Sequence, residues 1–281
     1  MAETTSTLLE DLTFAEGPRW HEGKLWFSDM HDQVVRTVDA SGRSEVVTKV
    51  PGDPSGLGWL PDGRLLVVSM RDRRLLRLDS GGLSEVADLS GLATYHCNDM
   101  VVDAVGRAYI GNFGYDLHGA GERRNAALIL VTPAGDARVV ADDLEFPNGT
   151  VITPDGGTLI IGETMGKRLT AFDIEADGSL CRRRTWAQFE DLLPDGICLD
   201  AAGAIWVASP ISHAVVRVAE GGEVLQRIPL ATQSFACMLG GPERRTLHIC
   251  TAETSDPATA QTLRTGRIET AQVDVAGAGL P

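Results

Sequence analysis

Oxygen-bearing side chains recur at one position of this sequence, immediately before apolar runs that alternate as β-strands do. The residues at that position are, in chain order, Glu16, Ser55, Asn98, Asn148, Asp195 and Ala236. Four of the six carry a carboxylate or carboxamide oxygen. If the six segments converge, the carboxylates of Glu16 and Asp195 repel each other and lose solvent, which is unfavourable unless a cation neutralises them.

A divalent metal ion resolves this electrostatic conflict, and the carboxamide of Asn148 adds a neutral oxygen to the donor set. The four oxygen-bearing residues include no His or Cys, and oxygen donors alone favour hard cations. We therefore predict one divalent ion, with Ca²⁺ as the first choice and Mg²⁺ or Mn²⁺ next. Zn²⁺ stays open, because catalytic zinc sites accept carboxylate ligands and keep an exchangeable position.

A simpler interpretation of two of these residues is purely structural. Gly149 and Gly196 directly follow Asn148 and Asp195, and Asn-Gly and Asp-Gly are common turn dipeptides. That interpretation suffices for either dipeptide alone. It does not account for oxygen-bearing residues at one position in four segments, so we favour the metal site.

An internal repeat supplies the elements that would bring these residues together. Six times, an apolar run meets a short turn and is followed by a second run of alternating apolar residues. The turn positions are Gly23, Gly63, Gly106, Gly156, Gly203 and Arg244, at intervals of 40 to 50 residues. Glycine suits them because tight hairpins need positive φ angles. A second hairpin follows each of the first five turns, so one repeat corresponds to one four-stranded antiparallel sheet.

A repeat of this length with period-two patterning is typical of a β-propeller. We predict an all-β fold of six blades in a single domain that spans residues 1–281. Segments 8–14 and 266–275 are expected to pair and close the ring, which removes two open sheet edges. The innermost strand of each propeller blade lines the axis, so the oxygen-bearing residues should meet at one end of the central channel.

Composition excludes several classes of partner. With 39 acidic and 25 basic residues the net charge is −14, which disfavours nucleic acid and anionic membranes. The five cysteines form no CxxC pair, and the N-terminus lacks the pattern of a signal peptide, so we expect a cytoplasmic protein. We expect a small-molecule partner, and a monomer or small homo-oligomer.

The motifs around these positions resemble those of the regucalcin/gluconolactonase (senescence marker protein) family over nearly the whole chain. The resemblance rests on Glu16-Gly-Pro-x-Trp, Leu25-Trp-Phe-Ser-Asp29, Asn98-Asp99 with Asp103 and Gly106, Pro147-Asn148-Gly149 and Pro194-Asp195-Gly196-Ile197. It implies a six-bladed propeller that hydrolyses lactones with a divalent metal. It also implies Glu16, Asn148 and Asp195 as metal ligands, with Asn98 beside the metal and in contact with substrate or a bound water.

One position departs from the family pattern. Members that act on sugar lactones often carry an arginine two residues before the equivalent of Asn98, where it faces substrate hydroxyls. This chain has His96 there, next to Tyr95. Together with segment 113–118 (Phe-Gly-Tyr-Asp-Leu-His), these residues predict a more aromatic pocket, with Tyr95, His96 and Asn98 binding the substrate. The alternative for His96 is that it is a residue of a surface loop.

The activity expected from these residues and the resemblance is hydrolysis of a lactone or a related cyclic ester. The metal would polarise the carbonyl and lower the pKa of a bound water. Asp195 is the candidate general base, and a role as ligand alone is its alternative. Three other functions stay open: phosphotriester hydrolysis of the diisopropylfluorophosphatase type, a non-catalytic Ca²⁺-binding propeller, and a non-hydrolytic reaction on a natural product.

Overall fold

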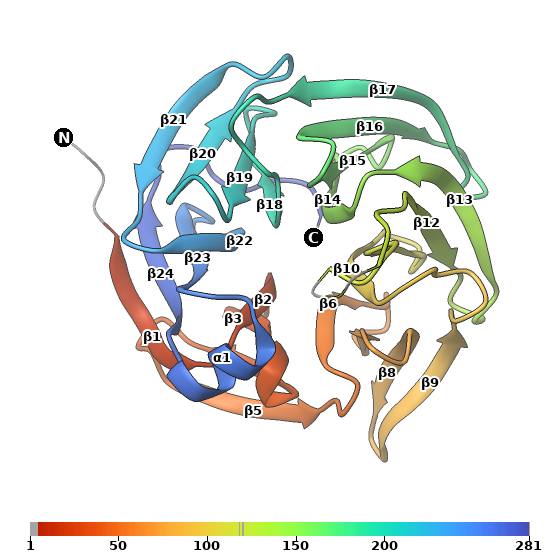
Figure 1. Ribbon diagram of the computed structural model, residues 1–281, viewed down its shortest axis with the longest axis horizontal. Coiled ribbons are helices and arrows are strands. Elements are labelled where there is room, and N and C mark those ends of the chain that lie inside the picture. The colour runs from red at the N-terminus through yellow and green to blue at the C-terminus, as the bar shows by residue number, and fades with distance from the viewer. Residues whose placement is uncertain (1–4, 118, 120, 281) are drawn as a thin grey trace.

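The computed structural model describes residues 5–117, 119 and 121–280. The strands within these residues form six four-stranded antiparallel sheets arranged around a central axis (Figure 1). The predicted all-β, six-bladed propeller is confirmed.

Each blade runs from an innermost strand at the axis to an outermost strand at the periphery (Figure 1). The first three blades are β2 (Ala15–His21), β3 (Lys24–Asp29), β4 (Val34–Val38) and β5 (Ser44–Lys49); β6 (Pro54–Trp59), β7 (Leu65–Ser69), β8 (Arg74–Asp79) and β9 (Gly82–Asp88); and β10 (Cys97–Val102), β11 (Ala108–Asn112), β12 (Ala126–Val131) and β13 (Ala137–Leu144). The next two are β14 (Pro147–Ile152), β15 (Thr158–Glu163), β16 (Arg168–Ile174) and β17 (Leu180–Gln188); and β18 (Ile197–Leu199), β19 (Ile205–Ser209), β20 (Ala214–Val218) and β21 (Val224–Pro229).

The sixth blade joins the two ends of the chain. It consists of β22 (Gln233–Gly240), β23 (Thr246–Ala252), β24 (Gly266–Gln272) and, outermost, β1 (Ser6–Leu12). β1 pairs antiparallel with β24, from Ser6 opposite Thr270 to Leu12 opposite Gly266. The predicted closure is therefore confirmed, and main-chain hydrogen bonds between the first and last strands hold the ring shut.

The turns of the repeat have the backbone conformation that their glycines predict. Five of the six positions have φ between 71° and 88°: Gly23, Gly63, Gly106, Gly156 and Gly203. Arg244, at the sixth position, also has a positive φ, of 52°. The last turn thus keeps a positive φ angle without glycine, the residue that adopts this conformation most readily.

The hydrophobic core lies between neighbouring blades. Phe27 of β3 and Leu247 of β23 belong to one buried cluster, and Ile160 of β15 and Val207 of β19 belong to another. Full burial of a Leu or Phe side chain stabilises a fold by about 1.5–3 kcal/mol. Packing between blades therefore fixes the positions of the innermost strands, which carry the candidate site.

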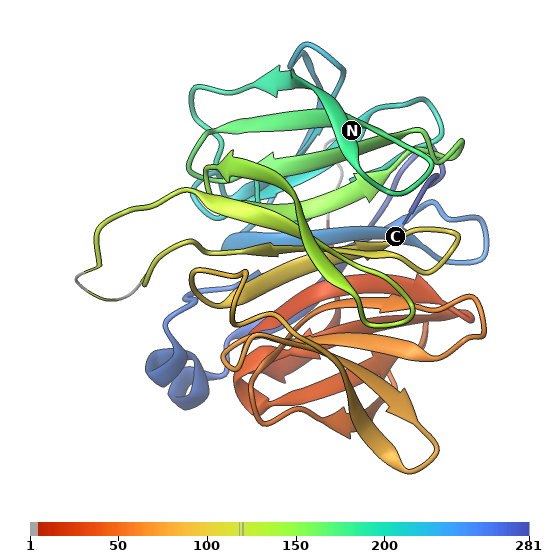
Figure 2. The ribbon, with the colours of Figure 1, turned by 90° about the vertical axis from the view of Figure 1, so that its right-hand side faces the viewer.

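Three segments depart from the repeat. A short helix, α1 (Pro257–Leu263), lies between β23 and β24, and a 3₁₀ turn, η1 (Met30–Asp32), follows β3. The side chain of Asp256 caps α1 by accepting a hydrogen bond from the backbone nitrogen of Thr259 at 2.9 Å. Figure 2 shows that α1 and the long connection between β11 and β12 project from the same end of the propeller. Of the helices described, none is long and apolar enough to span a membrane.

Candidate functional site

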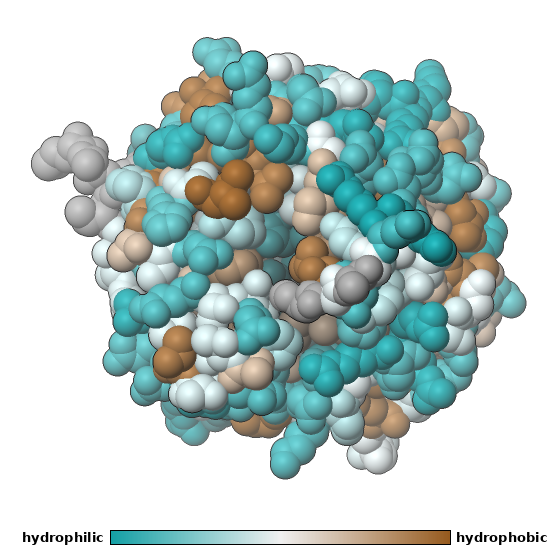
Figure 3. Space-filling model, in the orientation of Figure 1, coloured by the Kyte–Doolittle hydropathy of each residue, from teal (hydrophilic) through white to brown (hydrophobic). Residues whose placement is uncertain are grey.

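A cavity of about 490 Å³ opens at the end of the axis where the innermost strands begin. The space-filling view looks into the hollow at the centre of this face, with hydrophobic side chains at its margin (Figure 3). All six residues that the sequence predicts for the site line this one cavity: Glu16, Tyr95, His96, Asn98, Asn148 and Asp195. His118, in the predicted aromatic segment, lies outside the described residues.

The four oxygen-bearing residues form the floor of the cavity, and we call them the floor residues. Glu16 lies in β2, Asn98 in β10, Asn148 in β14, and Asp195 two residues before β18. Three of them are buried, with exposed fractions of 7% for Asn98 and Asn148 and 8% for Asp195, and Glu16 is partly buried. Ser55 and Ala236 hold the same position in the other two blades and are buried.

Close packing of neighbouring innermost strands explains the glycines that follow two floor residues. A Cβ atom on Gly149 would lie 2.5 Å from the backbone nitrogen of Ile197, and one on Gly196 would lie 2.4 Å from the Cβ of Ala236. The backbone nitrogen of Gly149 also donates to the carbonyl of Asp195, at 3.2 Å. Gly149 lies within β14 and Gly196 directly precedes β18, so the interpretation of these dipeptides as turns is wrong: glycine is needed here because adjacent blades touch at the axis.

Hydrogen bonds orient the two carboxamides of the floor. Asn148 Nδ2 donates to Thr164 Oγ1 at 3.2 Å, and the Thr164 hydroxyl donates to the carbonyl of Pro194 at 2.7 Å. Asn98 Nδ2 donates to the carbonyl of Pro147 at 3.3 Å. With their nitrogens held by the protein, both side chains keep a carbonyl oxygen for binding a cation or a water.

Electrostatics within the floor favour a bound cation. Burial raises the pKa of Glu16 from 4.5 to about 8, and the charge of Asp99 adds to this. Burial also raises the pKa of Asp195 well above its usual value, and the charge of Glu16 is the next largest cause. The two carboxylates therefore resist being ionised together, and a divalent cation between them removes that resistance.

The donor set fits a hard divalent cation. Within the described part of the chain, no three His, Cys, Asp or Glu side chains gather closely enough to hold a metal by themselves. The floor instead joins two carboxylates to two carboxamides, all oxygen donors. Ca²⁺ accepts such mixed sets with flexible geometry and completes its coordination with water.

An ion pair beneath the floor was not predicted from the sequence. Arg19 Nη2 donates to Asp99 Oδ1 and to the carbonyl of Met100, both at 2.6 Å, and Arg19 Nε donates to the carbonyl of Leu57 at 3.1 Å. Arg19 therefore ties together β2, β6 and β10. It also lines a second pocket at the opposite end of the axis, so the pair lies between the two pockets.

Acidic residues at the ends of second strands position the floor of two blades. In the first blade, Asp29 Oδ1 accepts hydrogen bonds from the backbone nitrogens of Thr13 and Phe14, at 3.0 and 3.2 Å. Arg36 Nε donates to Asp29 Oδ2 at 3.1 Å. The chain is thus fixed just before it reaches Glu16.

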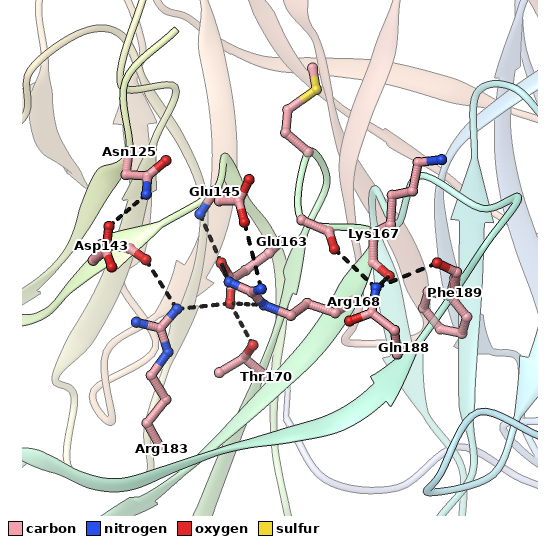
Figure 4. Close-up of polar contacts among 12 residues, drawn as sticks. Asn125, Asp143, Glu145, Glu163, Lys167, Arg168, Thr170, Arg183, Gln188 and Phe189 are labelled. Atoms are coloured by element: carbon pink, nitrogen blue, oxygen red, sulfur yellow. Dashed lines mark hydrogen bonds and ion pairs between the residues drawn. The ribbon is translucent and has the colours of Figure 1, made fainter.

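The fourth blade repeats this arrangement around Glu163 (Figure 4). Glu163 is fully buried and accepts from the backbone nitrogen of Glu145 at 2.8 Å, and also from Arg168, Arg183 and Thr170. This network holds the segment that leads into β14 and Asn148.

The same position in other blades also carries a polar anchor. Ser209 Oγ accepts from the backbone nitrogen of Leu193 at 3.0 Å, two residues before Asp195, and Asn112 Oδ1 accepts from the hydroxyl of Thr94 at 3.2 Å. A signal for these residues exists in the sequence. Asp29, Asn112 and Ser209 each follow their turn glycine by the same short interval, and Glu163 follows its own by one residue more.

Tyr95 and His96 lie on the cavity wall, and their rings stack with centroids 4.1 Å apart. His96 is half-buried in the loop that precedes β10 and lines the cavity. Burial, followed by the charge of Arg71, lowers the pKa of His96, which keeps its imidazole neutral at pH 7.

The fold and the cavity together define a six-bladed propeller with a buried, oxygen-lined site at one end of its axis. The model of the SMP-30/gluconolactonase/LRE-like family matches residues 14–253 of the chain. The protein belongs to this family and is a lactonase-like member of it.

Three known proteins show the range of the similarity. Pentonolactonase XacC of Haloferax volcanii is 27% identical over 244 residues, which cover 84% of this chain and 81% of that protein. A gluconolactonase structure from Xanthomonas campestris is 26% identical, with a TM-score of 0.77 over 99% of this chain and 89% of that one. A calcium-binding regucalcin from Agrobacterium tumefaciens, 24% identical, shares the fold with a TM-score of 0.80 over 100% and 97% of the two chains.

Proposed function

We propose that this protein is a divalent-metal-dependent hydrolase that opens a lactone ring. The observation that carries the proposal is the pair Glu16 and Asp195. These two carboxyl groups face one cavity and have raised pKa values, and the charge of Glu16 raises the pKa of Asp195. Membership of a family that contains lactonases supports the reaction class.

In this proposal Glu16, Asn148 and Asp195 hold the metal, and Ca²⁺ is the preferred ion. When bound, the cation supplies Lewis acidity that polarises the substrate carbonyl and acidifies water. Asn98 lies beside these three residues with its amide nitrogen tied to Pro147, so its carbonyl oxygen can orient a water or a substrate hydroxyl.

Asp195 is the proposed proton acceptor. Once its repulsion by Glu16 is neutralised, Asp195 keeps its carboxylate form and can take a proton from the attacking water. Water oxygen then bonds to the lactone carbonyl carbon, and the ring C–O bond breaks. The ring oxygen leaves as an alkoxide and takes up the proton, which yields the open hydroxy acid.

The test is lactone hydrolysis by the intact protein before and after removal of metal with EDTA. We expect activity to disappear and to return with Ca²⁺ or another divalent ion. Asp195→Asn should lower kcat by about 10²–10⁴-fold, and Glu16→Gln should weaken metal affinity by at least about 10–100-fold. Ser55→Ala is the matched control, because Ser55 holds the same position in its blade and lies outside the cavity lining.

Three outcomes would contradict the proposal. Full turnover by metal-stripped protein would exclude metal dependence. Faster hydrolysis of a phosphotriester than of any lactone would reassign the reaction. A large Ca²⁺-induced rise in melting temperature without turnover of any ester would instead indicate a structural ion, which stabilises the fold by binding only the folded state.

A further inference from the structure

The cavity has two layers of different chemistry. The residues two positions before the floor residues Glu16, Asn98, Asn148 and Asp195 are, in the same order, Phe14, His96, Phe146 and Leu193. All four line the cavity. They form a second layer, which we call the collar, between the floor and the opening. Three of these four side chains are hydrocarbon, and the fourth is an imidazole.

Aromatic contacts extend the collar into a continuous wall on one side. The rings of Phe113 and Phe146 stack with centroids 4.7 Å apart, and the imidazole of His96 lies 6.1 Å from Phe113. Stacking of Tyr95 on His96 continues the wall. Phe113, Phe146, His96 and Tyr95 all line the cavity, so this wall faces whatever is bound there.

A second apolar group adjoins this wall, because Phe113 packs against it. Phe14 packs edge-on against Phe235, with centroids 4.7 Å apart, and both belong to a buried cluster with Met30 and Met70. All four of these residues line the cavity. Methionine and aromatic side chains together make a surface that adapts to hydrocarbon.

The backbone of Phe146 is held in a conformation that a bulky residue rarely adopts. Its φ is +65°, in the left-handed region. Two hydrogen bonds hold the backbone there. The Thr164 nitrogen donates to the carbonyl of Phe146 at 3.1 Å, and the nitrogen of the preceding residue, Glu145, donates to the Glu163 carboxylate at 2.8 Å. The fold therefore keeps a strained backbone at the residue that presents an aromatic ring to the cavity.

Two polar residues of the cavity wall, Asp53 and His31, have partners within the protein, although His31 Nδ1 is buried without a hydrogen bond. The carboxylate of Asp53 pairs with Arg71 Nε at 2.7 Å and accepts from Gln33 Nε2 at 2.9 Å. His31 Nε2 lies 3.3 Å from the carbonyl of Ser255. A polyhydroxylated ring needs partners for each buried hydroxyl, and a buried hydroxyl without one is costly.

We propose that the substrate is a lactone with an apolar alkyl or aryl substituent on the ring, and not a polyhydroxylated sugar lactone. The lactone carbonyl meets the floor, and the substituent lies against Phe113 and Phe146. This inference rests on the proposed hydrolase function, because it names the substrate class of the same site.

The first test is a homologous series of γ-lactones, from γ-butyrolactone to γ-decalactone, with D-glucono-δ-lactone as the polar comparison. We expect kcat/KM to rise by about fourfold for each methylene buried, until the cavity is filled. Phe113→Ser should flatten this dependence on chain length. Val139→Ser should leave it unchanged, because Val139 is 43% exposed on β13 and does not line the cavity. Faster turnover of gluconolactone than of every alkyl lactone would overturn the inference.

A binding measurement separates this inference from the proposed reaction. Alkyl γ-lactams have the shape of the lactones and resist hydrolysis, so their affinity for the Ca²⁺-loaded protein can be followed by calorimetry. Affinity that increases with chain length, and loses that dependence in Phe113→Ser, supports the apolar class even if no lactone is hydrolysed. Affinity independent of chain length would contradict it, whatever the hydrolysis assay shows.

Discussion

Arg19 and Asp99 form a buried ion pair across the axis of the propeller, with 2.6 Å between Arg19 Nη2 and Asp99 Oδ1. Each residue lies in an innermost strand, Arg19 three positions after Glu16 and Asp99 one position after Asn98. The guanidinium also binds the main-chain carbonyls of Met100, in the same blade as Asp99, and of Leu57, in a third blade. The pair therefore links three blades directly beneath the floor.

Removing one member of this pair should destabilise the protein strongly. Asp99→Ala leaves the guanidinium of Arg19 buried without its anion, and we expect the free energy of unfolding to fall by about 3–5 kcal/mol. Urea denaturation measures this. Glu45→Ala, which removes the half-exposed partner of Lys24, should cost less than about 1 kcal/mol. Similar losses of unfolding free energy in the two variants would show that the axial pair stabilises the protein no more than an exposed ion pair does.

The stability of the metal-free protein should depend on pH through Glu16. The folded state raises the pKa of Glu16 from 4.5 to about 8, so it holds a proton that the unfolded chain releases. The resulting stabilisation is complete below about pH 4.5 and is lost as pH rises through about 8. We expect the melting temperature of EDTA-treated protein to fall between pH 5 and pH 8, and Glu16→Gln to reduce that fall.

The stabilisation of the protein by Ca²⁺ should instead increase with pH, because Ca²⁺ binds the ionised carboxylates. The rise in melting temperature caused by a fixed Ca²⁺ concentration should be small at pH 5 and larger at pH 8. Thermal melting with and without Ca²⁺ across this range provides the check. A Ca²⁺ effect that does not change with pH would place the ion away from Glu16 and Asp195.

Glu163 should act as a positioning residue for Asn148. In Glu163→Gln, the neutral amide weakens the ion pairs to Arg168 and Arg183 and presents a donor to the Glu145 nitrogen (Figure 4). We expect a loss of about 1–3 kcal/mol in unfolding free energy, together with weaker Ca²⁺ binding measured by calorimetry. Asp62→Asn changes an exposed carboxylate that pairs with Arg64 and should affect neither quantity. Unchanged Ca²⁺ affinity in Glu163→Gln would limit this residue to a structural role.

Much of the fold was determined by local pattern. Period-two apolar runs and regularly spaced turn positions predict the six blades. Each strand shows its own alternation of apolar and polar residues, and each hairpin has its own turn residue. The closing pair β1 and β24 was predictable too, since both ends of the sequence alternate and an open ring would leave two sheet edges unpaired. The convergence of Glu16, Asn98, Asn148 and Asp195 on one cavity follows from their common position in the repeat.

Other features depend on contacts between blades that no local pattern encodes. Arg19 and Asp99 meet only because innermost strands from different blades face one another across the axis. Gly149 and Gly196 have the sequence signature of turns, yet tertiary packing of adjacent strands is what requires them. Three of the four collar residues, Phe14, Phe146 and Leu193, were likewise unpredicted, because they precede the repeat's regular strands and Phe146 reaches the cavity through a left-handed backbone. The sequence alone therefore determined the blades and the oxygen-bearing floor, and the tertiary structure decided what surrounds that floor.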